Sequence, residues 1–129
     1  MKFMGYYTKF ELHAIDVETR CEIPRNMEYD ITYRLENIAF GSVEREDFEK
    51  WGPQSFDGWT GDTMKWYGHV DDMIALSKEY PNLIFVLDGV GEEFPDAWRK
   101  WFHNGQYEES YAEVVYPKPS NPLFAQFNY

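Results

Sequence analysis

Cysteine is almost absent from this chain, because Cys21 is the only one among the 129 residues. A single thiol excludes an internal disulfide and a zinc cluster ligated by cysteines, and it is typical of a reducing compartment. Long apolar runs are missing too, since no stretch approaches the roughly 18 consecutive apolar residues of a membrane-spanning helix. The first ten residues carry no such run either, so we expect no signal peptide.

Basic residues are scarce: 12 Lys and Arg stand against 23 Asp and Glu, which gives a net charge of -11. This balance argues against direct binding of duplex DNA, which needs basic side chains on the phosphates, and against an anionic membrane surface. An acidic surface suits a basic protein partner, with fast and salt-sensitive association. The alternative is that the acids only keep the protein in solution, and the sequence leaves both interpretations open.

Aromatic residues are abundant, at 19% of the chain. They can bury a large apolar area in a small body, and the length suits one domain. We therefore assign residues 1–116 to a single domain and residues 117–129 to a tail rich in proline and aromatics. Three prolines keep the tail from pairing as a regular strand. It either packs over the body, which we favour, through Leu123, Phe124 and Phe127, or docks into a partner.

Apolar periodicity predicts most elements of the domain. Alternation indicates a strand, and apolar residues three and four apart indicate a helix. In chain order the pattern predicts a strand over residues 3–15, helices over 26–40 and from Ser42 to about residue 52, a short strand over 62–67, and a helix over 69–80 that Pro81 ends. Residues 26–40 also show the alternation of a strand, and we choose the helix.

The last third of the domain reads as three strands. The apolar run LIFVL at residues 83–87 predicts a central strand buried on both faces, followed by an acidic, glycine-containing turn over 88–95. Asn104-Gly105 fits a type I′ turn between strands over 97–103 and 106–116. That register places Phe102 beside Tyr107, Lys100 beside Glu109, and Trp98 beside Tyr111.

This order of elements predicts an α+β fold, an antiparallel sheet with helices packed on one face. The ferredoxin-like arrangement is the nearest named architecture. We see no internal repeat and no second domain in the sequence.

Several short motifs keep a distinctive spacing along the chain: Met4-Gly5-Tyr6-Tyr7-Thr8, Lys65-Trp66-Tyr67, His69, Asp71-Asp72-Met73, Leu76-Ser77, Tyr80-Pro81, Gly89-Val90-Gly91-Glu92-Glu93, Asp96, Trp98, Phe102 and Asn104-Gly105. As a set they resemble a family of small, mostly uncharacterised proteins of bacteriophages and prophages. The resemblance covers less than half of the chain and leaves residues 16–62 without a counterpart. It implies a phage origin and a ferredoxin-like sheet, and it implies neither an established activity nor catalytic residues.

Catalytic and metal motifs are weak. The sequence has no phosphate-binding loop, no GxSxG elbow and no HExxH motif. His69, Asp71 and Asp72 crowd a helix start, where acids are favoured electrostatically without any metal. The acids around Gly89 and Gly91 lack the regular ligand spacing of a calcium loop. We therefore expect no enzyme activity, no metal and no cofactor.

Two acidic patches are the candidate contact surfaces. The first consists of Asp88, Glu92, Glu93 and Asp96, and the second of Glu44, Glu46 and Asp47. We expect a non-enzymatic phage protein that acts in the host bacterial cytoplasm. It would inhibit a basic bacterial protein or nucleoprotein complex, for example a CRISPR effector, by filling a groove meant for nucleic acid.

Two alternatives remain. A ligand-binding protein could sequester a signalling nucleotide between tryptophans such as Trp59, Trp66 and Trp98. A metal-dependent hydrolase using clustered carboxylates is the less favoured of the two.

Overall fold

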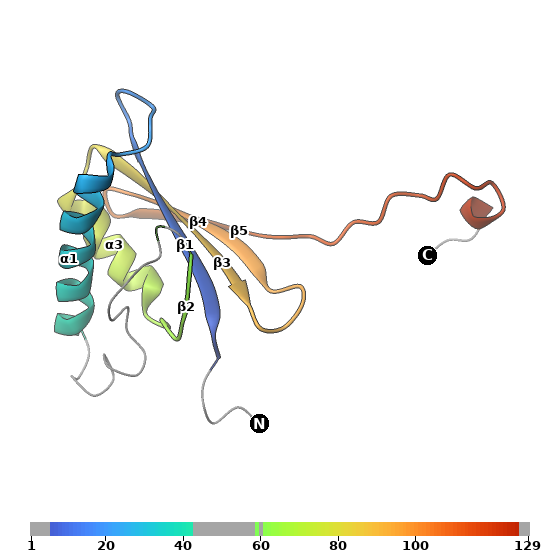
Figure 1. Ribbon diagram of the computed structural model, residues 1–129, viewed down its shortest axis with the longest axis horizontal. Helices are drawn as coiled ribbons and strands as arrows, with labels where there is room; N and C mark the ends of the chain where they lie inside the picture. Colours follow the sequence, from blue (N-terminus) through green and yellow to red (C-terminus); the bar gives the residue numbers. More distant parts are fainter. Residues whose placement is uncertain (1–5, 43–58, 60, 127–129) are drawn as a thin grey trace.

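Five strands and two helices make up the part of the chain that the computed structural model describes, which is residues 6–42, 59 and 61–126 (Figure 1). None of the helices in this part is long and apolar enough to cross a membrane. In chain order the elements are β1 (Thr8–Asp16), α1 (Arg25–Ser42), β2 (Asp62–Met64), α3 (His69–Glu79), β3 (Leu83–Gly91), β4 (Ala97–His103), β5 (Gln106–Tyr111) and the short 3-10 helix η1 (Phe124–Gln126).

The strands form one sheet in the order β2-β1-β3-β4-β5, and every neighbouring pair is antiparallel. Both helices lie on the same face of this sheet (Figure 1). The predicted α+β class, with helices on one face of an antiparallel sheet, is therefore confirmed. The ferredoxin-like arrangement is compatible with this architecture and stays a prediction.

Alternating burial shows how the strands make the core. In β1 the side chains of Phe10, Leu12 and Ala14 are buried and their neighbours are half-buried or exposed, because successive residues of a strand point to opposite faces. The buried residues meet one stripe of each helix, where apolar positions recur at helical spacing. The core residues of the helices are Ile31, Leu35, Met73 and Leu76.

The central strand is longer and more one-sided than the sequence predicts. β3 runs from Leu83 to Gly91, so residues 88–91 belong to the strand, and the prediction of a turn from Asp88 onward is wrong. Burial on both faces is wrong as well, because Ile84 and Val86 are only half-buried. In the described part of the chain, the helices cover one face of the sheet and leave the other face open.

The predicted hairpin is confirmed around Asn104 and Gly105, whose φ angles of 45° and 84° fit a type I′ turn. All three predicted pairs lie opposite each other in the β4–β5 register. The rings of Phe102 and Tyr107 stack with centroids 5.3 Å apart. β5 ends at Tyr111, earlier than predicted. The predicted short helix after Ser42 lies outside the described residues.

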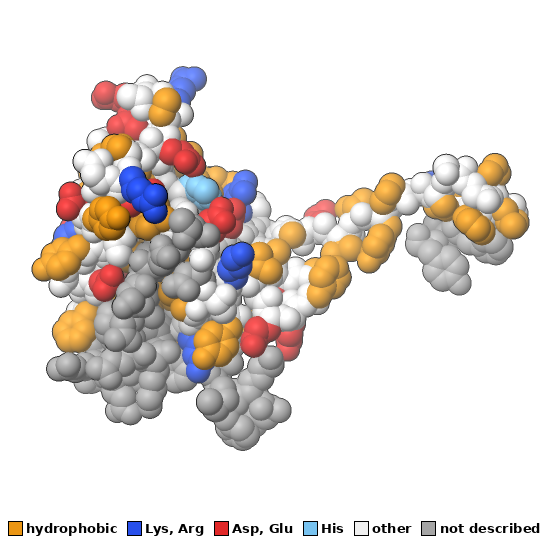
Figure 2. All heavy atoms as spheres, viewed as in Figure 1, with side chains coloured by type: hydrophobic (Ala, Val, Ile, Leu, Met, Phe, Trp, Pro, Cys, Tyr) orange, Lys and Arg blue, Asp and Glu red, His pale blue; other side chains and the backbone are white. Residues whose placement is uncertain are grey.

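The tail does not pack on the domain. Residues 112–126 are exposed throughout, and they lead away from the helices and the sheet (Figures 1 and 2). Figure 2 shows hydrophobic side chains along this segment. The expectation that Leu123 and Phe124 cover the body is wrong, because both are largely exposed. Phe127, the third residue of that prediction, lies outside the described part.

Candidate functional site

The open face of the sheet carries a row of charged side chains. The strand register places Glu11 opposite Asp88, and Asp88 opposite Arg99. These residues alternate with the core positions of β1, β3 and β4, and so they point away from the helices. Arg99 donates from Nε and Nη2 to the two carboxylate oxygens of Asp88, at 2.6 and 2.9 Å. This two-pronged ion pair raises the pKa of Arg99 further above its ordinary value.

His13 lies between two carboxylates on the same face. Its Nε2 is 2.7 Å from Glu11 Oε2, and its Nδ1 is 3.0 Å from Glu22 Oε1. Partial burial lowers the pKa of His13, but the hydrogen bonds to Glu11 and Glu22 outweigh burial, and the pKa is raised. With an acceptor at both ring nitrogens, the arrangement stabilises the protonated imidazolium.

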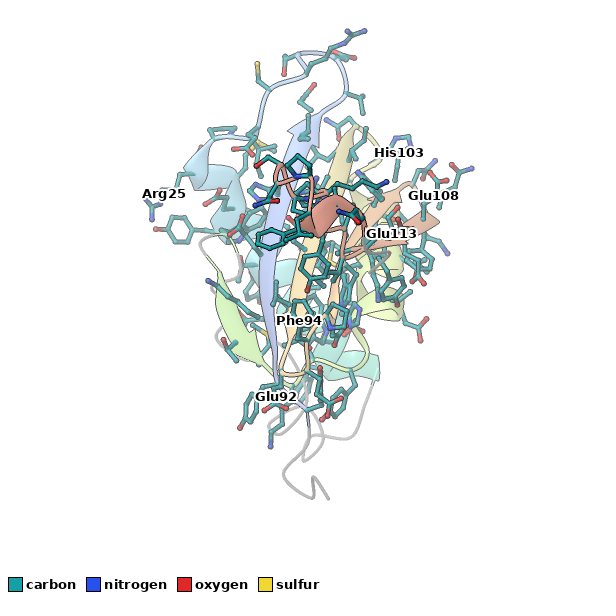
Figure 3. The ribbon with its side chains drawn as sticks, turned by 90° about the vertical axis from the view of Figure 1, so that its right-hand side faces the viewer. Arg25, Glu92, Phe94, His103, Glu108 and Glu113 are labelled. Carbon is teal, nitrogen blue, oxygen red and sulfur yellow. The ribbon has the colours of Figure 1, made fainter. Side chains whose placement is uncertain are left out.

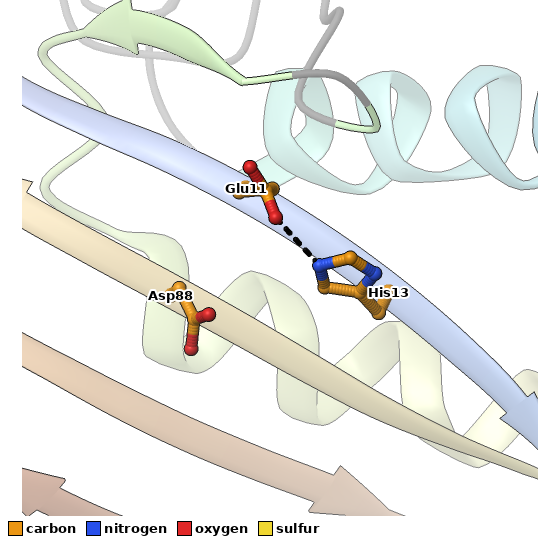
Figure 4. Close-up of side chains that lie close together, drawn as sticks. All are labelled: Glu11, His13 and Asp88. Atoms are coloured by element: carbon orange, nitrogen blue, oxygen red, sulfur yellow. Dashed lines mark hydrogen bonds and ion pairs between the residues drawn. The ribbon is translucent and has the colours of Figure 1, made fainter.

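Among the described residues, Glu11, His13 and Asp88 could together hold a metal, since one ligand atom from each lies within 4.8 Å of the others (Figure 4). Each of the three already has an ionic partner within the chain. A divalent cation would have to remove Arg99 from Asp88 and break the contact between His13 and Glu11. The existing contacts account for this group as an ion-pair network, and we assign no metal to it.

The loop from β3 to β4 is held in place by hydrogen bonds. We call residues 92–96 the acidic loop. The Tyr6 hydroxyl donates to Asp96 Oδ2 at 2.8 Å and accepts from the Glu93 backbone N–H at 2.9 Å. The Gly91 N–H donates to the Asp96 carbonyl at 2.8 Å. A Cβ at Gly91 would collide with both Tyr6 and Asp96, so glycine is what lets these two side chains meet.

The acidic loop presents two carboxylates and a phenyl ring to solvent. Glu92 and Glu93 are exposed. The next residue, Phe94, precedes the cis Pro95 and is 81% exposed (Figure 3). Beside the loop lies a hollow of about 250 Å³, whose apolar wall includes Val90, Ala112 and Val114. An exposed aromatic ring next to acids and an apolar hollow is a typical protein contact surface.

A second depression lies on the open face of the sheet. We call it the sheet groove, and its volume is about 440 Å³. Its apolar lining includes Val90, Ala97 and Trp101, and the Asp88–Arg99 ion pair lies within it. It shares Val90 and other wall residues with the hollow beside the acidic loop.

The structure separates the residues of the first predicted patch. Glu92, Glu93 and Asp96 come together on the acidic loop, with Asp96 half-buried. Asp88 lies inside β3 and pairs with Arg99. The second predicted patch, Glu44, Glu46 and Asp47, lies outside the described residues.

Sequence reasoning missed Phe94 and Trp101 as surface residues. The alternation of Val86, Asp88 and Val90 along β3 was the available signal for the open face, because it extends the period-two pattern past the apolar run.

On the covered face of the sheet, the charged side chain of Lys100 is only 6% exposed. Its Nζ lies 2.8 Å from His69 Nε2 and 4.1 Å from the centroid of the Trp98 ring, with Glu109 Oε1 at 3.9 Å. Burial, and then the positive charge of Lys100, lower the pKa of His69 from 6.5 to about 4. His69 is therefore neutral at pH 7, with Nε2 accepting from Lys100 and Nδ1–H donating to the Trp66 carbonyl at 2.9 Å.

The residues considered as metal ligands or base-stacking groups have other partners. Asp72 is buried and accepts from Trp66 Nε1 at 2.8 Å. Its carboxylate and the His69 ring therefore do not face a common metal site. Trp66 is itself fully buried, and Trp59 Nε1 donates to the Thr32 hydroxyl at 2.8 Å. Trp98, the third tryptophan considered for a nucleotide, stacks on His69 at the covered face with ring centroids 4.9 Å apart.

Comparisons with known proteins add no relative. No family model matches the chain, and neither a curated protein nor a solved structure matches it.

Proposed function

We propose that this protein is a non-enzymatic acidic protein of phage origin, and that it binds and inhibits a basic protein or nucleoprotein complex in the host bacterial cytoplasm. The observation that carries the binding function is the acidic loop, which presents Glu92, Glu93 and Phe94 on a hydrogen-bonded frame. The phage setting rests on the motif resemblance alone. The net charge of -11 agrees with a basic partner.

The geometry of the acidic loop favours binding in two ways. An exposed aromatic ring is the kind of anchor that fills a partner pocket and dominates interface energy. The bonds from Tyr6 to Asp96 and Glu93 hold the loop before the partner arrives. A preordered loop loses less conformational entropy on binding, which leaves more of the contact energy as affinity.

The carboxylates would act as substitutes for phosphates. Basic grooves of nucleic-acid-handling proteins attract any dense arrangement of negative charge, and CRISPR effector complexes contain such positively charged channels. Glu92 and Glu93 would enter the groove while Phe94 contacts its apolar wall. Nucleic acid would then be excluded by competition for the same basic residues, without any chemical step.

The test compares two double charge reversals of equal net charge. Glu92→Lys with Glu93→Lys alters the acidic loop, whereas Glu18→Lys with Asp30→Lys alters exposed acids on the β1–α1 connection and on α1. Tagged wild type and both variants are incubated with bacterial lysate at low and high salt, and retained proteins are identified by mass spectrometry.

We expect wild type and the Glu18→Lys, Asp30→Lys variant to retain the same basic protein at low salt. The Glu92→Lys, Glu93→Lys variant should lose it. Thermal melts by circular dichroism verify that all three are folded. Equal retention by the two variants would show that the position of the acids is irrelevant, and it would overturn the proposal.

A further inference from the structure

We propose that this chain forms a dimer by exchanging tails, so that residues 113–126 of one copy lie in the sheet groove of the other. We call these residues the arm. The inference does not depend on the acidic loop or on the function proposed for it.

The arm exposes large apolar side chains away from the body of its own domain. Tyr116 is 80% exposed and Phe124 is 58% exposed, and Val115 and Leu123 are exposed as well. Hydrophobic side chains line the segment where it leaves the body (Figure 2). A soluble monomer rarely leaves so many neighbouring apolar side chains uncovered.

The sheet groove is the matching unfilled surface. It lies on the face that the helices leave open, and Val90 in its lining is more than half exposed. Trp101 adds an aromatic ring. Each chain thus carries both an uncovered apolar segment and an uncovered apolar groove.

The arm leaves its own groove behind. The Ala112 N–H donates to the Ala97 carbonyl at 2.8 Å, which continues the β5 direction past the end of the sheet. Pro117 and Pro119 then hold the backbone extended and restrict the residues before them. A reversal between residues 113 and 119 is therefore disfavoured, and the arm projects away from its own open face (Figure 1).

The arm is long enough to cross a neighbouring sheet. Residues 113–119, which come before the turn and η1, reach roughly 22 Å at about 3.1 Å per residue. Five strands spaced about 4.8 Å apart span some 20–24 Å. A standard stable interface involves roughly 20–30 residues on each side. The arm and the sheet groove of each copy together provide about that number of residues.

The chemistry of the arm fits the groove. Proline-rich segments are preordered and dock in grooves lined by aromatic rings, and Trp101 provides such a ring. Lys118 is the only basic residue of the arm, and the open face offers the carboxylates of Glu11 and Glu108. Since each copy contributes the same arm and the same groove, two reciprocal contacts close a two-fold dimer.

The experiment measures the mass of the full-length chain by sedimentation equilibrium, from micromolar to sub-millimolar concentration. One variant alters the arm, Tyr116→Ser with Phe124→Ser, and another alters the groove, Val90→Glu. The matched control, Tyr29→Ser with Tyr33→Ser, removes two exposed aromatic residues from α1. We expect a dimer for wild type and control, and at least a tenfold weaker dimer for the arm and groove variants.

Mixing the arm variant with the groove variant gives a further readout. The groove variant has an intact arm and the arm variant has an intact groove, so one contact forms in a mixed dimer. We expect the mixture to associate more tightly than either variant alone. A wild-type monomer at every concentration, or a dimer that neither variant weakens, would overturn the proposal.

Discussion

The two faces of the sheet are built from the same strands but differ in chemistry. On the covered face, Phe10, Leu87 and Phe102 are fully buried beneath the helices. On the open face, adjacent positions of the same strands carry Glu11 and Asp88, with Trp101 half-buried among them. Alternation along each strand separates a face that stabilises the fold from a face available for binding.

The pKa values of the histidines on the two faces shift in opposite directions. Burial, and then the positive charge of Lys100, lower the pKa of His69 on the covered side. Hydrogen bonds to Glu11 and Glu22 raise the pKa of His13 on the open face, where partial burial opposes them. Burial and a cationic neighbour thus favour the neutral ring, and carboxylate neighbours favour the charged ring.

The largest expected effect comes from truncating neighbouring aromatic residues of β4. Phe102→Ala removes a fully buried ring and should lower the free energy of unfolding by about 3–5 kcal/mol, because it leaves a cavity in the core. Trp101→Ala, one residue earlier on the open face, should cost less than half as much. Urea unfolding of both variants measures the difference, and equal losses would refute the division between the faces.

An intermediate effect is expected from lowering the pH, through His69. Its pKa is about 4 in the folded chain, against an ordinary value of 6.5. The unfolded chain therefore binds this proton more readily, so the stabilisation is complete above pH 6.5 and is lost as the pH falls toward 4. The loss amounts to roughly 3 kcal/mol. Urea unfolding at pH 7 and pH 4 should show this component for wild type, and His69→Gln should lack it.

The control for this prediction changes the neighbour of His69. Lys100→Met removes the positive charge and should raise the pKa of His69, as measured by NMR titration of its ring protons. A pKa near 6.5 in the wild-type protein would contradict the buried lysine–histidine contact.

The smallest effect on stability is expected for His13, and its dependence on pH has the opposite sign to that of His69. Its pKa is raised in the folded chain, so its contribution is fully present below pH 6.5 and is lost as the pH rises through the folded value. The side chain is one-third exposed, and solvent screening keeps the contribution small. NMR titration should place its pKa above that of His69, and Glu22→Gln should lower it. An unchanged pKa of His13 in this variant would contradict the hydrogen bond between His13 and Glu22.

Local signals explain what the sequence predicts well. Asn104-Gly105 determines the hairpin and its register, and the register in turn places Lys100 beside Glu109. Pro81 ends α3, and alternation reveals the buried side of β1. Each of these features depends on residues that are close together in the chain, so the sequence alone is enough to predict them.

Contacts between distant segments explain what the sequence could not predict. Lys100 is buried because α3 brings His69 over it, and Asp88 is neutralised because β4 places Arg99 opposite. Gly89 and Gly91 suggested a turn, but both lie in β3 and permit close packing. Trp98 packs on Gly89, and Tyr6 and Asp96 pack on Gly91. Such tertiary needs override the local preference of glycine for turns.

Under the proposed function, the acidic loop binds a basic surface because of where its charges lie. The affinity of the purified partner for wild type and for the Glu92→Lys, Glu93→Lys variant, over a range of salt concentrations, tests this. We expect tight, steeply salt-dependent binding to wild type, and weak binding with little salt dependence for the variant. Equal affinities with equal salt dependence would contradict it.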